Sequence, residues 1–198
     1  MNHLIITAHP SENSFSNYLS QSIYEFHKNK AWTVTVRDLY KIEFNPVLSP
    51  NDLKMMKLGQ TPFDIQREQN YLSAADLITV IYPLWWAGFP AILKGYIDRV
   101  LTNGFAFRYT ENGPVPLMKG QQVILHTTMG NTVEEYEAKG LIEAFRRSQG
   151  DEIFGYCGME VIDHLFYPQI TLADENRRNH FLEMALEAYQ PVQTSRLF

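Results

Sequence analysis

Residues 83–90 hold the aromatic side chains and loop backbone that suit a planar ligand. Trp85 and Trp86 lie between Pro83 and Pro90, after an apolar run and before a helix-like run. Aromatic rings offer a flat apolar surface, and free N–H groups of such a loop can bond the polar edge of a ring system. Core packing is the alternative, because large aromatic residues are usually buried. The first interpretation predicts that a planar cofactor binds here.

Hydroxyl groups gather where a helix is expected to begin, between residues 11 and 16. Ser11, Ser14 and Ser16 follow His9 along the chain. The first turn of a helix has unpaired N–H groups and a partial positive charge, which favour a phosphate. His9 could donate to the same phosphate, or it could be a structural histidine. Capping of the helix by Asn13 or Ser14 is the simpler alternative.

Two further segments carry candidate site residues. Residues 127–130 (Thr-Thr-Met-Gly) supply hydroxyls and a flexible glycine after another strand-like run, although a tight turn between strand and helix would use the same residues. Phe105, Phe107 and Tyr109 alternate along the chain, as the residues on one face of a strand do. They could roof a pocket or pack against a partner subunit.

Several well-known chemical motifs are missing from the sequence. Residues 9–16 contain neither Gly-x-Gly-x-x-Gly nor Gly-x-x-x-x-Gly-Lys-Ser/Thr, which disfavours a Rossmann turn and a P-loop. The histidines lack metal-ligand spacing, so no metal is expected, and there is no Gly-x-Ser-x-Gly elbow. Glu134, Glu135 and Glu137 form a run that is typical of a solvated helix face. Stacked aromatic residues without an acid, base or nucleophile indicate that a cofactor carries the chemistry.

Five short apolar runs predict the strands that hold these loops, at residues 4–8, 32–36, 77–81, 123–127 and 161–165. Helical periodicity begins at Phe15 and recurs at residues 65–75, 92–101, 133–147 and 174–189. The connection after Tyr40 is polar, and residues 103–118 are irregular. Strands that alternate with helices predict an α/β fold with a parallel sheet covered on both faces. The loops after strands one, three and four would then share its carboxyl edge.

The composition is that of one ordinary globular domain, and no linker divides residues 1–198. Hydrophobic residues make up 45% and charged residues 20% of the chain. The net charge of -5 disfavours nonspecific nucleic-acid binding, which needs a basic surface. Cys157 is the single cysteine, and the sequence has neither a signal-peptide pattern nor a membrane-length apolar run. We therefore expect a cytoplasmic protein.

Taken together, these segments resemble the flavodoxin-like NAD(P)H:quinone oxidoreductase family of the flavodoxin-2 type. This family includes the mammalian quinone reductases, bacterial drug-activity modulators and the ancillary flavoproteins of potassium-efflux systems. The resemblance implies a doubly wound, five-stranded parallel sheet of the flavodoxin type with helices on both faces. The matching residues are 9–17, 38–40, 44–46, 68–69, 74–77, 83–86, 90–95, 105–109 and 127–130.

The resemblance implies that the cofactor is a flavin, FMN or alternatively FAD. Its phosphate would lie on the loop after the first strand, and its ring on the other two loops. Phe105, Phe107 and Tyr109 would belong to the substrate pocket. The mammalian members have a long C-terminal extension that helps to hold the adenosine end of FAD, and the shorter chain here favours FMN. The implied cofactor-binding residues are His9, Ser14, Phe15, Ser16, Asn17, Pro83, Leu84, Trp85, Trp86, Ala87, Thr127, Thr128, Met129 and Gly130.

The resemblance also implies a ping-pong oxidoreductase. NADPH or NADH would pass a hydride to the flavin N5 and leave, and a quinone or a similar acceptor would then take the same place. Family members are typically homodimers with the site at the interface. The alternative is a regulatory flavoprotein that binds a potassium-efflux transporter at the membrane.

The sequence departs from the mammalian members at two points. Met129 stands where they carry a second glycine. They also place a tyrosine and then a histidine after this loop, as a proton relay to the quinone. Tyr136 lies near the expected tyrosine and is the candidate catalytic residue, but the next histidine is His164. Water or Tyr136 alone would then serve as the relay.

Overall fold

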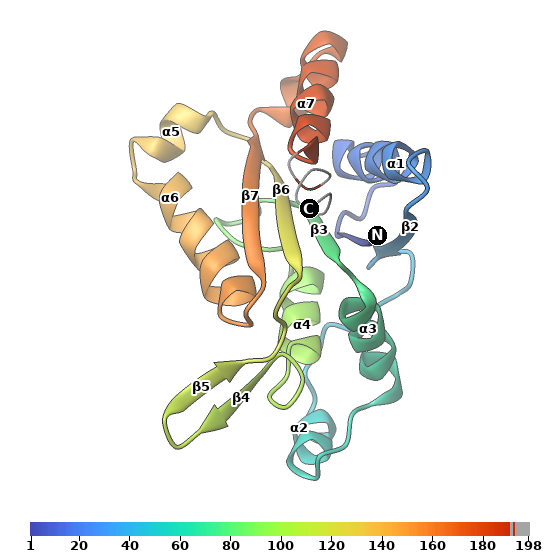
Figure 1. Cartoon of the computed structure of the whole chain (residues 1–198). Coiled ribbons are helices and arrows are strands. Elements are labelled where there is room, and N and C mark those ends of the chain that lie inside the picture. Colours follow the sequence, from blue (N-terminus) through green and yellow to red (C-terminus); the bar gives the residue numbers. More distant parts are fainter. Residues whose placement is uncertain (191, 193–198) are drawn as a thin grey trace.

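A parallel sheet of five strands forms the centre of the chain, of which the computed structural model describes residues 1–190 and 192 (Figure 1). The strands lie in the order β2-β1-β3-β6-β7, and all neighbours are parallel. Each strand overlaps one of the apolar runs in the sequence, so the predicted sheet is confirmed. The predicted domain end at residue 198 lies outside the described residues. The strands are β1 (Asn2–Thr7), β2 (Thr33–Asp38), β3 (Leu77–Pro83), β6 (Gln122–Thr128) and β7 (Glu160–Tyr167).

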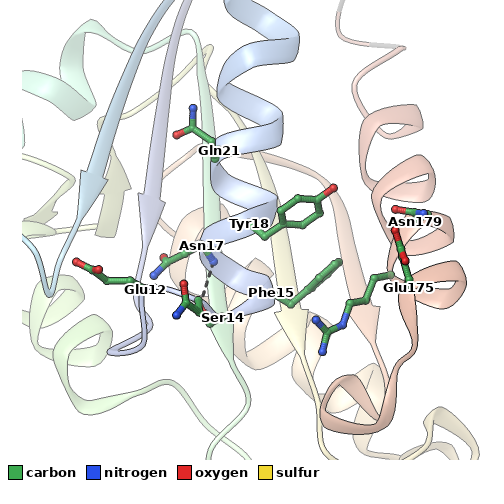
Figure 2. A pocket seen from close by; sticks show the side chains of 10 residues that line it. Glu12, Ser14, Phe15, Asn17, Tyr18, Gln21, Glu175 and Asn179 are labelled. Carbon is green, nitrogen blue, oxygen red and sulfur yellow. Dashed lines mark hydrogen bonds between the residues drawn. The ribbon is translucent and has the colours of Figure 1, made fainter.

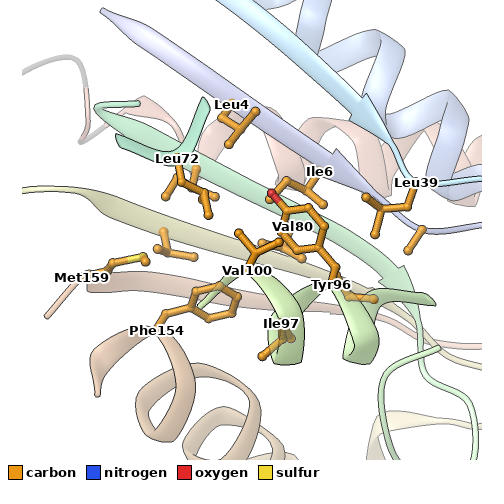
Figure 3. Close-up of a cluster of buried hydrophobic side chains, with 14 of the residues drawn as sticks. Leu4, Ile6, Leu39, Leu72, Val80, Tyr96, Ile97, Val100, Phe154 and Met159 are labelled. Atoms are coloured by element: carbon orange, nitrogen blue, oxygen red, sulfur yellow. The ribbon is translucent and has the colours of Figure 1, made fainter. Parts of the chain in front are cut away.

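Alternate strand residues pack on opposite faces of the sheet. Ile5, Ile81 and Ile124 belong to one apolar cluster, whereas Ile6 and Val80 belong to a second one, shown in Figure 3. Because both faces are buried, the strands are mainly apolar, and every residue of β3 is buried. The helices are α1 (Phe15–Lys28) and α7 (Glu175–Glu187) on the first face and α3 (Phe63–Ala74) and α4 (Ala91–Val100) on the second.

A short helix, α2 (Pro50–Lys57), interrupts the connection after Tyr40, which the sequence analysis treated only as polar. Ser49 and Asp52 form a reciprocal capping box around its first turn, and Pro50 occupies a position where its missing N–H is not needed. This spacing of serine, proline and aspartate was the available signal for a helix start.

The segment 103–118 is not irregular, because it contains a β-hairpin. Strands β4 (Phe107–Thr110) and β5 (Gly113–Pro116) pair antiparallel. The hairpin follows the end of α4 and precedes the start of β6, and the N–H of Met118 donates to the carbonyl of Cys157 at 2.9 Å. It therefore lies at the amino end of the parallel strands, away from the loops after β1, β3 and β6 (Figure 1).

The helix predicted for residues 133–147 is divided. It consists of α5 (Val133–Glu137) and α6 (Leu141–Phe145), and a π-helix, η1 (Arg146–Gly155), continues it. Gly140 separates the first two pieces because its backbone is left-handed, with φ 66°. A 3-10 turn, η2 (Ile170–Leu172), follows β7. Within the described part of the chain, no helix is both long and apolar enough to cross a membrane.

Candidate functional site

Three loops meet at the carboxyl edge of the sheet, as the sequence predicted. The N–H of Ala8 donates to the carbonyl of Ile81 at 3.0 Å, and the N–H of Leu84 donates to the carbonyl of Thr128 at 2.8 Å. The rings of His9 and Trp85 lie 6.1 Å apart, which joins the first loop to the second. The edge therefore brings together candidate residues that are more than 70 positions apart in the chain.

The first loop ends in the N-terminus of α1, where two serines differ in their contacts. Ser14 is the N-cap, and its hydroxyl accepts the N–H of Asn17 at 3.2 Å. Ser16 is only 1% exposed, and its hydroxyl has no hydrogen-bond partner among the described residues. A buried hydroxyl without a partner is unfavourable unless a ligand completes it. The N–H groups of Phe15 and Ser16 are likewise left over at the helix start.

His9 stands beside this helix start. Its Nδ1 accepts the N–H of Ser11 at 3.1 Å, so the proton of the neutral imidazole lies on Nε2 and can be donated. Partial burial lowers the pKa of His9 from its ordinary value. Asn17 is held by Thr7, whose hydroxyl donates to its Oδ1 at 3.2 Å, and by the carbonyl of Ser11. The loop thus offers fixed neutral donors to an anion.

The second loop presents aromatic residues to solvent. Trp85 is 41% exposed and Trp86 is fully exposed, whereas Leu84 is buried. The backbone turns sharply here: Trp85 and Gly88 exchange two backbone hydrogen bonds, at 2.9 and 3.1 Å. Trp86 and Ala87 occupy the two central positions with φ 51° and 59°, a left-handed conformation that is unusual without glycine. The turn therefore holds an exposed tryptophan in a strained backbone.

The third loop contributes backbone rather than side chains. Thr127, Thr128 and Met129 are at most 4% exposed, and only Gly130 is open to solvent. The hydroxyl of Thr127 lies 2.8 Å from Nε2 of His164, inside the protein. Met129 packs in an apolar cluster with Leu84, so its side chain does not enter the site. The methionine at the position where a glycine was expected is therefore buried.

A buried polar bridge, consisting of Tyr82, Gln149 and His164, lies beneath the second and third loops. The hydroxyl of Tyr82 donates to Oε1 of Gln149 at 2.6 Å, and it lies 3.3 Å from Nε2 of His164. Nε2 of Gln149 donates to the carbonyl of Ala87 at 3.5 Å. Burial lowers the pKa of His164 to about 3, so its ring is neutral. No sequence pattern indicates this bridge, because its members are spread over three elements, β3, η1 and β7.

Tyr136 lies on α5, beside the third loop. Its half-buried ring packs edge-on against Phe145, with the ring centroids 5.7 Å apart. The same apolar cluster contains Met129, which connects this helix to the loop. The predicted catalytic tyrosine is therefore near the edge of the sheet, whereas His164 is buried in the core and cannot follow it in a solvent-facing relay.

The predicted substrate residues are at the opposite end of the molecule. Phe107 and Tyr109 lie on β4, where the ring of Phe107 also contacts Tyr156 at 5.3 Å. Tyr109 is 69% exposed, and Phe105 packs partly against the core at the base of the hairpin. Since the hairpin lies at the amino end of the strands, these side chains cannot cover the three loops of their own chain.

A cavity of about 510 Å³ adjoins the first loop, between α1 and α7. Figure 2 shows Ser14, Phe15 and Tyr18 on one side and Glu175 and Asn179 on the other. Arg178 also lines it and brings a positive charge close to the helix start. In residues 1–190 and 192, no cluster of histidine, cysteine and acidic side chains could hold a metal ion. The arrangement suits a flat organic group that carries a phosphate.

Known proteins are similar to this chain over most of its length. Residues 1–191 match a family described as having a flavodoxin-like fold. A Haemophilus influenzae protein named as an uncharacterized NAD(P)H oxidoreductase is 42% identical, over 100% of this chain and 98% of its own. The rat NAD(P)H dehydrogenase (quinone) 1 is 32% identical, over 81% of this chain and 66% of the rat chain. The structure of an NAD(P)H:quinone oxidoreductase from Methanothermobacter marburgensis has a TM-score of 0.84 and 28% identity, over 98% and 97%.

Proposed function

The chain belongs to the flavodoxin-like family that it matches over residues 1–191, and on this premise we propose that it is a flavin-dependent NAD(P)H:acceptor oxidoreductase. Its acceptor is a quinone or a similar compound, as the names of the rat and archaeal relatives suggest. The observation that carries the proposal is the unpartnered, buried hydroxyl of Ser16 at the start of α1, beside a loop of exposed tryptophans.

The residues at this edge fit a flavin. A phosphate would take the free N–H groups of Phe15 and Ser16, the Ser16 hydroxyl and Nε2 of His9. The ring would lie on the loop that contains Trp85 and Trp86 and against the backbone of residues 127–130. Thr127 and Met129 face inward, so they would support the third loop rather than touch the ring.

A bound flavin supplies the two-electron chemistry between NAD(P)H and the acceptor. The chain's own residues would bind the flavin and orient it. The exposed rings of Trp85 and Trp86 shield one side of the site from water, and Tyr136 carries a phenolic proton close to the edge. Because donor and acceptor would use the same apolar space, they bind in turn, which is the ping-pong order. Tyr136 as the proton donor is part of this proposal.

FMN is the proposed cofactor, and one observation favours FAD as the second candidate. The cavity between α1 and α7 opens directly beside the phosphate loop, and Tyr18 and Arg178 line it. A second phosphate and an adenosine would find a cation and an aromatic face there. Heat releases the bound flavin from the purified protein, and its identification as FMN or FAD decides between the two candidate cofactors.

We include a homodimer in the proposal, because the predicted substrate residues of one chain lie far from its own three loops. Phe107 and Tyr109 lie on a hairpin at the far end of the strands, with Tyr109 69% exposed. Trp86 is fully exposed at the near end. In a symmetric dimer, the hairpin of each subunit can cover the loops of the other. We also propose that residues 1–198 act as one domain in the cytoplasm, where the buried thiol of Cys157 stays reduced.

The visible absorption spectrum of the purified protein, taken anaerobically before and after addition of NADPH, tests the function. We expect two bands of oxidised flavin that bleach on addition. Bands that stay would favour the regulatory flavoprotein that binds a potassium-efflux transporter. Absence of bands, even after reconstitution with FMN and FAD, would contradict the flavoprotein assignment.

A further inference from the structure

Gln149 connects the core of the protein to the strained turn of the second loop. It is 4% exposed and lies in the π-helix η1, far in sequence from the turn. Its Oε1 accepts the proton of Tyr82 at 2.6 Å, and its Nε2 donates to the carbonyl of Ala87 at 3.5 Å. A π-helix is a rare element that is frequent at functional sites. Here it places the Gln149 amide beneath the loop.

The hydrogen-bond inventory fixes the orientation of this amide. The carbonyl of Ala87 can only accept, so the nitrogen of Gln149 must face it, and the oxygen must face Tyr82. Tyr82 has a single proton, which it gives to Gln149. The Tyr82 hydroxyl also lies 3.3 Å from Nε2 of His164. The same Nε2 lies 2.8 Å from the hydroxyl of Thr127, which is near the end of β6, just before the third loop.

The bridge thus connects the second loop to the end of β6, the strand that leads into the third loop. One end reaches the carbonyl of Ala87, within the turn whose two central residues have φ 51° and 59°. The other end reaches Thr127. Left-handed residues other than glycine persist only where the surroundings hold them, and they are common at binding sites. A buried amide bonded to Ala87, one of the two central residues of the turn, can provide such support.

We propose that Gln149, oriented by Tyr82, is a positioning residue that sets the Trp85–Gly88 turn relative to the third loop and so determines the affinity of the flavin site. The inference rests on the proposed function. It predicts that loss of the Gln149 amide weakens flavin binding more than general destabilisation of the fold would explain. Gln149 touches the backbone of the turn and acts through it.

A buried tyrosine on the opposite face of the sheet supplies the control. Tyr189 is 0% exposed, like Tyr82, and its hydroxyl also has two side-chain contacts, to Thr79 and His126 at 2.8 Å each. It belongs to the apolar cluster under α1 and α7, whereas Tyr82 belongs to the other cluster. Loss of either hydroxyl removes comparable buried hydrogen bonds, but only the loss at Tyr82 frees the Gln149 amide.

The test measures FMN binding to the apoprotein and urea unfolding of the apoprotein for Gln149→Met, Tyr82→Phe and Tyr189→Phe. Methionine keeps the length of glutamine and removes its hydrogen bonds. We expect Gln149→Met and Tyr82→Phe to raise the Kd for FMN about tenfold. A change of this size corresponds to the free energy of one or two lost hydrogen bonds. Tyr189→Phe should lose as much stability as Tyr82→Phe while its Kd stays within about twofold of the wild-type value.

Two results would overturn the inference while the proposed function stands: wild-type FMN affinity in Gln149→Met and Tyr82→Phe, or equal weakening in all three variants. The second result would mean that the bridge acts only on general stability. If Gln149→Met does not fold, Tyr82→Phe against Tyr189→Phe decides alone. A wild-type apoprotein that binds neither FMN nor FAD would overturn the proposed function itself, and the inference with it.

Discussion

Ser14 and Ser16 lie two positions apart at the start of α1, but they have different partners. Ser14 caps the helix through the N–H of Asn17, whereas the buried hydroxyl of Ser16 is unpartnered within the described residues. A cap stabilises the folded chain with or without a ligand. An unpartnered hydroxyl contributes only when a ligand completes it.

We therefore expect opposite effects from two alanine substitutions. Ser14→Ala should lower the free energy of unfolding of the apoprotein by about 1 kcal/mol. Ser16→Ala should leave that free energy unchanged or slightly higher and should weaken flavin binding about tenfold. Urea unfolding of the apoprotein and a flavin titration measure both quantities. Equal flavin affinity in Ser16→Ala and the wild type would remove Ser16 from the site.

Buried histidines make the folded state sensitive to acid. Burial lowers the pKa of His126 and of His164 to about 3 each, and the pKa of His27 to about 4. Both nitrogens of His126 are bonded to tyrosine hydroxyls, to Tyr167 at 2.6 Å and to Tyr189 at 2.8 Å. A proton added to this ring in the core would find no charge to balance it.

Stability should be constant above the ordinary histidine pKa and should fall below it. The histidines of the unfolded chain bind protons as the pH falls below about 6.5, whereas the buried histidines of the folded chain bind them only near their lowered pKa values. For His126, lowering the pH from about 7.5 to about 5 should cost about 2 kcal/mol. Urea unfolding at both pH values should show that His126→Gln reduces this drop, whatever its effect at the higher pH. The exposed His180, replaced in the same way, controls for the loss of a histidine. An unchanged drop in His126→Gln would contradict the assignment.

At the scale of elements, the packing of α4 on the chain before α2 leaves no room for a side chain at Gly95. A Cβ there would overlap the carbonyl oxygen and Cβ of Pro46 and would lie 2.6 Å from its Cα. Arg99, one turn further along α4, bonds Asp52 of α2 at 3.1 Å and the carbonyl of Asn45 at 2.8 Å. The connection that contains α2 is thus held on α4.

Gly95→Ala should destabilise the protein by about 3 kcal/mol, because the clash is with backbone that cannot yield. Glycine to alanine in an ordinary helix interior instead stabilises by about 1 kcal/mol. Lys94→Ala, at the neighbouring exposed position, should change the stability by less than about 0.5 kcal/mol, because it loses only the surface pair with Asp98. Thermal or urea unfolding measures both. A stabilised Gly95→Ala would show that the two segments can separate without cost.

At the scale of the whole molecule, the distance between the hairpin and the loops predicts that two chains share each site. Ser16→Asp would bury a carboxylate where the phosphate is expected, so its own loops should not hold flavin. Phe107→Ala should keep flavin and lose mainly substrate use. A heterodimer of the two variants, isolated through two different tags, should contain one intact site with loops and hairpin from different chains. Its turnover with NADPH and a quinone should be about half that of the wild type.

If the heterodimer is no more active than the better homodimer, the hairpin does not serve the partner's site. Sedimentation of the wild type provides the necessary control, because a monomer would exclude any exchange of this kind.

The sequence alone determined the strands of the sheet and the three loops, and it narrowed the cap of α1 to Asn13 or Ser14, of which the structure has Ser14. The reason is local: apolar runs form buried strands, helical periodicity lies between them, and loops that follow parallel strands must emerge at one edge. The start of α2 was also encoded locally, in the spacing of Ser49, Pro50 and Asp52, although the polar composition obscured it.

Only the tertiary structure decided which side chains face the site. Thr127, near the end of β6, and Met129, directly after it, lie close in sequence to the exposed Gly130, but their side chains face inward, where they contact His164 and an apolar cluster. The union of Tyr82, Gln149 and His164 depends on three elements that no local pattern connects. The hairpin lies far from the loops because α4 carries the chain back along the length of the sheet. Each of these features depends on contacts between residues that are far apart in the sequence, so no local sequence pattern predicts it.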